Sequence, residues 1–139
     1  MSKVDWATLK EGDEIPPIDM LPTLESVLRY CALNWAFQGF FYDDAAAQAM
    51  GMPEALIPGP FKVGWLYRAV DEWLDGAGFI RQVRAANRRP DHKNNPVTIA
   101  GHVVRVYEEG GAKRADLEMA VINKEGQPSV RGFAVVEFR

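Results

Sequence analysis

The sequence predicts one α+β domain in which helices come first and an antiparallel sheet follows. Before residue 79, apolar side chains recur at spacings of three and four, which is typical of helices. From residue 79 onward they alternate, and β-branched residues become frequent. The length of 139 residues suits a single hydrophobic core. We therefore expect residues 1–139 to form one domain.

The first part of the chain predicts three helices, over residues 24–35, 45–50 and 61–74. The first follows Thr23, whose hydroxyl suits the N-cap position. The third is the clearest, because Pro60 suits its first turn and large apolar side chains recur along it at helical spacing. A helix with so much apolar bulk is expected to be buried over much of its surface.

The second part predicts four strands, over residues 79–86, 97–107, 115–123 and 129–138. Loops rich in Asn, Pro, Gly, Asp and Glu separate them. The last three strands are expected to form two successive antiparallel hairpins, and the sheet is expected to wrap the 61–74 helix. Pro16 and Pro17 close an opening segment to which we assign no strand.

The composition excludes several kinds of site. A net charge of -3 argues against a general nucleic-acid binder, which relies on clustered basic charge. One cysteine cannot form a disulfide within the chain, and the spacing of Cys31, His92 and His102 matches no zinc pattern. We expect no metal and no cofactor, so any catalysis would depend on carboxylates, backbone donors or hydroxyls.

The hydropathy pattern predicts neither a membrane span nor a signal peptide. No stretch reaches the roughly 18 apolar residues that a membrane helix needs. The N-terminal residues also lack the apolar run of a signal peptide. We expect a cytoplasmic protein whose partners include neither nucleic acid nor membrane.

Several short motifs follow one another along the chain. They are Gly-Asp-Glu-Ile-Pro at 12–16, Tyr-Asp-Asp-Ala-Ala-Ala at 42–47 with Gly51, Ile-Pro-Gly-Pro at 57–60, Ala-Val-Ile-Asn-Lys-Glu-Gly at 120–126, and Val-Arg-Gly-Phe-Ala at 130–134. In their order and spacing, the chain resembles the MaoC-like family of (R)-specific enoyl-CoA hydratases and dehydratases over nearly its whole length. This resemblance implies the hotdog fold, an antiparallel sheet wrapped around a long central helix. It also implies an acyl-CoA or other acyl thioester as substrate or ligand.

The proton-transfer motif of that family is altered in this chain. The family motif is Asp-x-Asn-x-x-His, whose Asp and His hold the water that adds to an enoyl thioester. The resemblance places Ala36 at the Asp position, Gln38 at the Asn position and Phe41 at the His position. Ala and Phe carry no proton, and each such group normally contributes a factor of about 10²–10⁴. We expect little hydratase activity from this chain alone.

The family also includes assemblies in which one subunit has the catalytic pair and its partner has lost it. This sequence is similar to the degenerate partner. The resemblance therefore implies a non-catalytic or weakly catalytic subunit, in a homodimer or in a heteromer with a catalytic hotdog chain. Fatty-acyl or steroid-type acyl thioesters are the implied substrates.

Asp43 and Asp44 leave two interpretations open. They suit the N-cap and the first turn of the 45–50 helix, where acidic side chains are favoured. Alternatively one of them is a general base, which would make the chain a hotdog acyl-CoA thioesterase that uses a carboxylate. Asp43 and Asp44 are thus the catalytic candidates.

A third interpretation is a lipid- or polyketide-binding module without chemistry. The aromatic candidates for lining its cavity are Trp35, Phe37, Phe40, Phe41, Trp65 and Trp73. Aromatic residues at these spacings also form ordinary cores and dimer interfaces. If a thioester site persists, the side chains expected to contact substrate are Phe37, Phe40, Tyr42 and Trp65.

The remaining binding candidates are a backbone donor and a group of arginines. Gly59 suits the backbone geometry of a helix entry, and its N–H could also face a thioester carbonyl. Candidates for the CoA phosphates, or alternatively solvated charges, are Arg81, Arg84, Arg88 and Arg89. We expect His92 to be solvated in a polar loop, and His102 to be a structural or surface residue on a strand.

Overall fold

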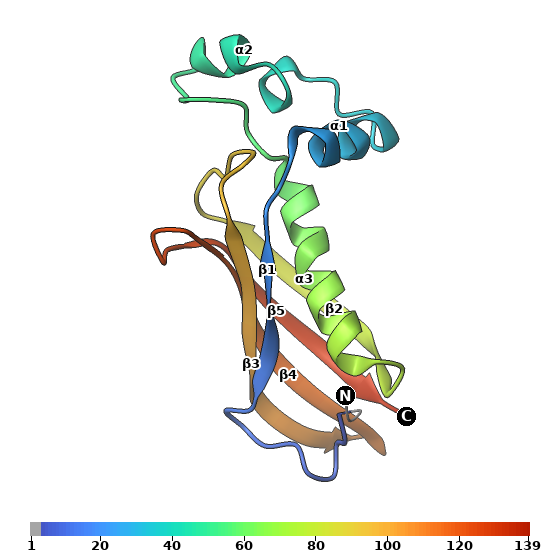
Figure 1. The fold of residues 1–139 in the computed structure, drawn as a ribbon. Helices are drawn as coiled ribbons and strands as arrows, with labels where there is room; N and C mark the ends of the chain where they lie inside the picture. The colour runs from blue at the N-terminus through green and yellow to red at the C-terminus, as the bar shows by residue number, and fades with distance from the viewer. Residues whose placement is uncertain (1–3) are drawn as a thin grey trace.

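The sheet and the long helix of the domain are shown in Figure 1, a computed structural model that describes residues 4–139. The elements in chain order are β1 (Glu14–Met20), α1 (Leu24–Leu33), the 3-10 helix η1 (Gly39–Phe41), α2 (Asp44–Gln48), α3 (Gly59–Leu74), β2 (Gly78–Asn87), β3 (Val97–Glu109), β4 (Ala112–Asn123) and β5 (Pro128–Phe138). The helix α3 lies lengthwise against one face of the sheet (Figure 1). The segment 24–56, which we call the cap, contains α1, η1 and α2 and lies beyond the N-terminal end of α3 (Figure 1).

The sheet is antiparallel, with five strands in the order β1-β3-β4-β5-β2. The predicted hairpins are confirmed, since β4 pairs with β3 on one side and with β5 on the other. The strand that follows α3 returns to the far edge of the sheet and pairs with β5. Two edges are therefore exposed, one on β1 and one on β2.

The strand β1 corrects the sequence prediction, which gave four strands and no strand in the opening segment. Ile15 pairs with Gly101 and Ile18 with Ile99 on β3, and the register shifts between the two pairs. The two prolines 16 and 17 lie at this shift. Proline has no N–H for the ladder and is tolerated only at edges and irregularities. The two prolines therefore argued against a strand in the sequence. The strand can form because it lies at the edge of the sheet.

The helices form where predicted, with shifted ends. The capping box at the start of α1 is complete, because Thr23 and Ser26 each accept a hydrogen bond from the other's backbone N–H. This helix ends at Leu33 instead of residue 35, since Trp35 adopts a left-handed φ of 54°. The long helix begins at Gly59, two residues earlier than predicted.

The core lies between α3 and the sheet. The buried apolar residues of α3 are Trp65, Leu66, Ala69, Val70 and Leu74. Fully burying each such aliphatic side chain stabilises the fold by roughly 1.5–3 kcal/mol. The helix approaches β5 closely at Gly132, where a Cβ atom would lie 2.6 Å from Leu66 Cδ1. Within residues 4–139, no helix has the length and apolar character needed to cross a membrane.

Candidate functional site

A hollow of about 360 Å³ lies at the N-terminal end of α3. Its walls come from η1, from the helix entry and from the end of β2, and they include Phe41, Gly59, Lys62, Arg88 and Arg89. Phe41, Gly59, Arg88 and Arg89 are residues that the sequence singled out. Tertiary structure thus brings Phe41, the helix entry and two of the four arginines to one place.

Gly59 supplies a backbone donor at this hollow. The first N–H groups of a helix have no partner within it. Pro60 has no N–H, while Phe61 and Lys62 both direct theirs to the Pro58 carbonyl, at 3.1 and 3.3 Å. The Gly59 N–H is therefore the first-turn donor that remains for a ligand at the positive end of the helix dipole.

Glycine at position 59 also lets β2 end close to the helix. A Cβ atom there would lie 2.6 Å from Nδ2 of Asn87, the last residue of β2. Any larger residue would displace the Asn87 side chain from the rim of the hollow. The present position of the Asn87 side chain thus depends on glycine at this entry.

Phe41, which the resemblance places at the histidine of the motif, lines the hollow with an aromatic ring. Phe41 is half-buried against the core and packs edge-to-face on Phe40, with ring centroids 4.5 Å apart. Ala36 is also half-buried against the core, whereas Gln38 is exposed at the start of η1. Among the described residues that line the hollow, none is a carboxylate or a histidine.

The cap carries exposed aromatic side chains. Trp35 and Phe37 are 82% and 57% exposed, and their rings meet edge-to-face. Tyr42 is half-buried, and its hydroxyl donates to the Phe37 carbonyl at 2.7 Å. Phe40 is half-buried beside Phe41. The structure therefore spreads the predicted substrate-contacting aromatics over different environments.

Trp65 lies inside the molecule, in an aromatic stack that the sequence analysis missed. Tyr30 of α1 stacks on Phe61 of α3 with centroids 4.7 Å apart, and Phe61 meets Trp65 at 5.3 Å. Trp65 is 4% exposed, and its Nε1–H has no hydrogen-bond partner among the described residues. Burial raises the pKa of Tyr30 and of the neighbouring Cys31 thiol. The stack is formed by two helices that are distant in the sequence, so no local sequence pattern predicts it.

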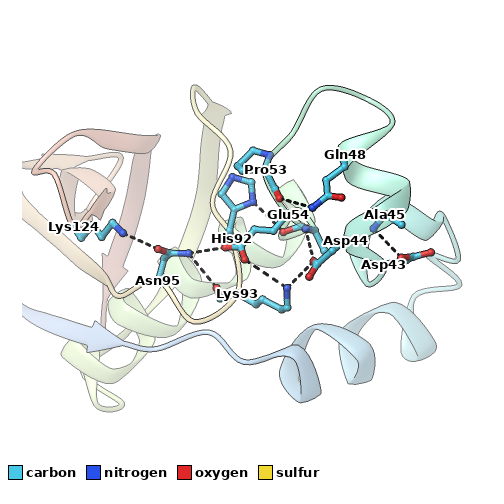
Figure 2. A network of polar contacts seen from close by, with 11 residues as sticks. Asp43, Asp44, Ala45, Gln48, Pro53, Glu54, His92, Lys93, Asn95 and Lys124 are labelled. Atoms are coloured by element: carbon cyan, nitrogen blue, oxygen red, sulfur yellow. Dashed lines mark hydrogen bonds and ion pairs between the residues drawn. The ribbon is translucent and has the colours of Figure 1, made fainter.

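Asp43 and Asp44 both have structural partners. Asp43 is the N-cap of α2 and accepts from the Ala45 N–H at 3.0 Å. Asp44 Oδ1 accepts from Lys93 Nζ at 2.7 Å and from the Ala55 N–H at 2.9 Å, as Figure 2 shows. The hydrogen bond from Lys93, with that from Ala55, lowers the pKa of Asp44. This carboxylate is consequently a weaker base than a free aspartate.

The same network ties the cap to the loop before β3 (Figure 2). Asn95 donates to Glu54 at 3.0 Å and accepts from Lys124 Nζ at 3.0 Å. His92 is half-buried, with Nδ1 3.0 Å from the Ala55 carbonyl oxygen, which corrects the expectation of a solvated side chain. The other histidine, at position 102, is exposed on β3, as expected for a surface residue.

The four arginines divide into two pairs. Arg88 and Arg89 lie at the hollow, and both of their backbone N–H groups donate to the Ser129 carbonyl, at 2.7 and 3.2 Å. Arg81 lies 3.7 Å from Glu137, and the Arg84 guanidinium lies over the Phe133 ring. Arg81 and Arg84 therefore have partners along β2 and do not line the hollow. In the first pair, Arg89 Nη1 donates to the Pro128 carbonyl at 3.1 Å.

A buried ion pair behind the hollow was not singled out from the sequence. Lys62 Nζ donates to Asp91 Oδ2 at 3.0 Å and to the Arg89 carbonyl at 2.9 Å. The Lys62 and Asp91 side chains are 2% and 3% exposed. A sequence signal existed, because Lys62 lies at helical spacing from Leu66 and Ala69 on the buried face of α3.

A larger hollow, of about 1180 Å³, lies between β1, the segment before it and the C-terminal half of α3. Its walls combine Trp73 and other apolar side chains with six carboxylates, from Asp5, Asp13, Glu14, Asp19, Glu72 and Asp75. These carboxylates would repel the phosphates of CoA. Although this second hollow is the larger of the two, its charge does not suit a CoA thioester. Within residues 4–139, no group of three or more His, Cys, Asp or Glu side chains is arranged to hold a metal ion.

Comparison with known proteins identifies the fold. No protein-family model matches the sequence, and no curated protein matches it. Solved structures do match along almost the whole chain. The (R)-hydratase from A. caviae involved in PHA biosynthesis has a TM-score of 0.87 at 18% identity, covering 95% of this chain and 98% of that one. The ChsH1-ChsH2 complex from Mycobacterium tuberculosis gives 0.83 at 18% identity, with 94% and 98% covered.

A MaoC-like dehydratase from Rhodospirillum rubrum gives a TM-score of 0.83 at 14% identity, covering 96% of this chain and 95% of that one. At these identities the likeness establishes the fold. The predicted α+β hotdog fold, an antiparallel sheet around a long central helix, is confirmed.

Proposed function

We propose that this chain, which has the hotdog fold of MaoC-like dehydratases and (R)-hydratases, is a non-catalytic or weakly catalytic subunit of an acyl-thioester hydratase. In this proposal it binds the thioester at the N-terminal end of α3, and another hotdog chain supplies the proton-transfer pair. Fatty-acyl or steroid-type CoA thioesters are the proposed substrates.

The observation that carries the proposal is the lining of the hollow. It is lined by a backbone donor at Gly59, by two guanidinium-bearing residues, Arg88 and Arg89, and by Phe41, which the resemblance assigns to the motif's histidine. Such a site can hold a thioester carbonyl and its anionic tail. It offers no carboxylate or imidazole to move a proton to or from carbon.

The edges of the sheet support a partner chain. The β1 edge spans seven residues, two of them proline, whereas the β2 edge spans the ten residues Gly78–Asn87 without a proline. Phe79 on β2 and Tyr67 on α3 are 43% and 45% exposed. One matching structure is itself a complex of two differently named chains, ChsH1 and ChsH2. These features favour a hotdog partner that joins along β2.

The test is hydration of enoyl-CoA substrates, from short-chain to steroid-type, measured with the purified chain and again after co-purification with hotdog chains of its native host. We expect no turnover alone and turnover in the complex. A partner chain whose own Asp and His have been replaced is the matched control and should abolish the gain. Robust turnover by the isolated chain would contradict the proposal.

The two other interpretations have less geometric support. A thioesterase would need Asp43 or Asp44 as a free base, and both carboxylates accept hydrogen bonds that position α2. Thiol release from acyl-CoAs that Asp44→Asn abolishes would favour it over the hydratase subunit. A lipid-binding module would retain an apolar ligand, which native mass spectrometry of the purified chain detects.

A further inference from the structure

We propose that the buried Lys62–Asp91 ion pair is a positioning device that holds Arg88 and Arg89 at the entry of α3. The proposal rests on the proposed function, because those arginines are taken as the phosphate-binding groups. Neither Lys62 nor Asp91 is assigned a contact with substrate here.

The pair needs an explanation beyond stability. Lys62 is among the largest fully buried side chains, and it lies on the apolar face of α3. Taking an ammonium and a carboxylate out of water is costly, and well-packed apolar residues often replace such a pair without loss of stability. A leucine or methionine at position 62 would continue the apolar face. Such apolar residues could not form the directed hydrogen bonds that the Lys62 ammonium donates.

Those hydrogen bonds all go to one short segment. Lys62 Nζ reaches the Arg89 carbonyl and the Asp91 carboxylate, which belong to residues two apart on the chain that leaves β2. From the sheet side, the Ser129 carbonyl accepts the N–H groups of Arg88 and Arg89. From the link between the cap and α3, the Ile57 N–H donates to the Asp91 carbonyl at 2.9 Å. The segment 88–91 is thus fixed from α3, from β5 and from the residue that follows the cap.

Asp91 has an electrostatic role, which is to neutralise the charge of Lys62. The positive end of the α3 dipole, Lys62, Arg88 and Arg89 gather like charge around one hollow. Asp91 neutralises the buried ammonium within hydrogen-bond distance, so the net positive charge at the surface comes from the arginines. A ligand that carries anionic groups as well as a thioester fits this arrangement better than a neutral thioester does.

The experiment replaces the pair together, as Lys62→Met with Asp91→Leu, because either single change would leave one buried charge without its partner and would endanger folding. Removing the exposed Arg68–Glu72 pair of the same helix, as Arg68→Ala with Glu72→Ala, is the matched control. The probes are acetyl-CoA and S-acetylpantetheine, which share the thioester and differ in the nucleotide phosphates. Amide hydrogen exchange at Arg88 and Arg89 is measured in parallel.

We expect the double variant to fold, to exchange the amides of Arg88 and Arg89 faster while β4 stays protected, and to bind acetyl-CoA about tenfold more weakly. Binding of S-acetylpantetheine should be unchanged. Arg88→Ala should weaken acetyl-CoA binding in the wild-type chain and add little in the double variant, because both changes remove the same placed group. If the ion pair has a purely structural role, the losses of acetyl-CoA affinity caused by Arg88→Ala and by the double variant should add. The double variant should then also bind both probes more weakly, to the same extent.

Unchanged exchange at residues 88 and 89 in the folded double variant would overturn the inference, as would additive losses with Arg88→Ala. If the wild-type chain binds neither probe, the proposed function fails. In that case the exchange measurement still decides whether the pair holds the segment in place.

Discussion

Lys93 Nζ donates to Asp44 Oδ1 at 2.7 Å, which ties the loop before β3 to the first turn of α2 across 49 positions of sequence. Asp44 is one of two carboxylates that the sequence offered as a general base. The hydrogen bond from Lys93 favours the ionised form of Asp44, and through it this side chain anchors the cap. This relationship gives a stability prediction that depends on pH.

Asp44→Asn should destabilise the fold at neutral pH and have little effect in acid. The pKa of Asp44 is lower in the folded chain than in the unfolded one, where it is about 3.9. Its contribution is therefore fully present above that value and is lost as the pH falls through the folded pKa. Urea unfolding of both proteins between pH 7 and pH 3 measures the difference. Asp43→Asn is the control, since asparagine caps a helix as well as aspartate does; a deficit in Asp44→Asn that persists unchanged at pH 3 would contradict the assignment.

If the proposed function holds, introducing the acid and base of the MaoC-like motif should produce hydratase activity. The variant Ala36→Asp with Phe41→His has an acid and a base at the two positions that the resemblance assigns to the motif, and position 41 lines the hollow with Gly59. We expect hydration of short enoyl-CoA substrates to rise at least about 100-fold over the wild-type chain, the lower end of what one general acid or base contributes. Phe41→Ala removes the same ring without adding a proton carrier and should give no gain. If Phe41→Ala gains as much as the double variant, the missing groups are not what limits the reaction.

Charge reversal should separate the two arginine pairs. Arg88→Glu should weaken acetyl-CoA binding strongly, and the loss should shrink as salt rises, because screening weakens charge interactions at an exposed site. Arg84→Glu makes the same change of charge on β2, but the Arg84 guanidinium lies over Phe133 and does not line the hollow, so binding should be nearly unaltered. Calorimetric titration at two salt concentrations measures both. Equal losses in the two variants would indicate general attraction between CoA and a basic surface.

Two glycines packed differently should respond in opposite directions to alanine. Gly132→Ala places a Cβ atom 2.6 Å from Leu66 Cδ1, between β5 and α3, and should destabilise by about 1–3 kcal/mol through overpacking. Gly64 lies exposed in α3 with no atom within 4 Å of its would-be Cβ, so Gly64→Ala should stabilise by about 0.5–1 kcal/mol. Thermal and urea unfolding measure both changes. Stabilisation by Gly132→Ala would mean that helix and sheet are not in close contact there.

Much of the candidate site could be predicted from the sequence, because several of its residues belong to short local motifs. Gly59, Phe41 and the two arginines at 88 and 89 were named because a Pro-Gly-Pro helix entry, an altered motif and a basic run are visible in short windows. Lys62 was overlooked because a lysine is expected to be solvated, and its partner Asp91 is 29 positions away. The Tyr30–Phe61 stack was missed for the same reason, since α1 and α3 meet only in the folded chain.

The sequence by itself determined the class of fold, the central helix and the hairpins, because periodicity, capping residues and turn residues act over a few positions. Through the resemblance, it also predicted that Ala36 and Phe41 stand where the MaoC-like motif has its acid and base. Only the tertiary structure decided that the Pro16–Pro17 segment joins the sheet, that Asp44 is held by Lys93, and that a buried ion pair supports the helix entry. Each of these depends on groups far apart in the chain, whose hydrogen bonds and burial exist only once the sheet has closed around α3.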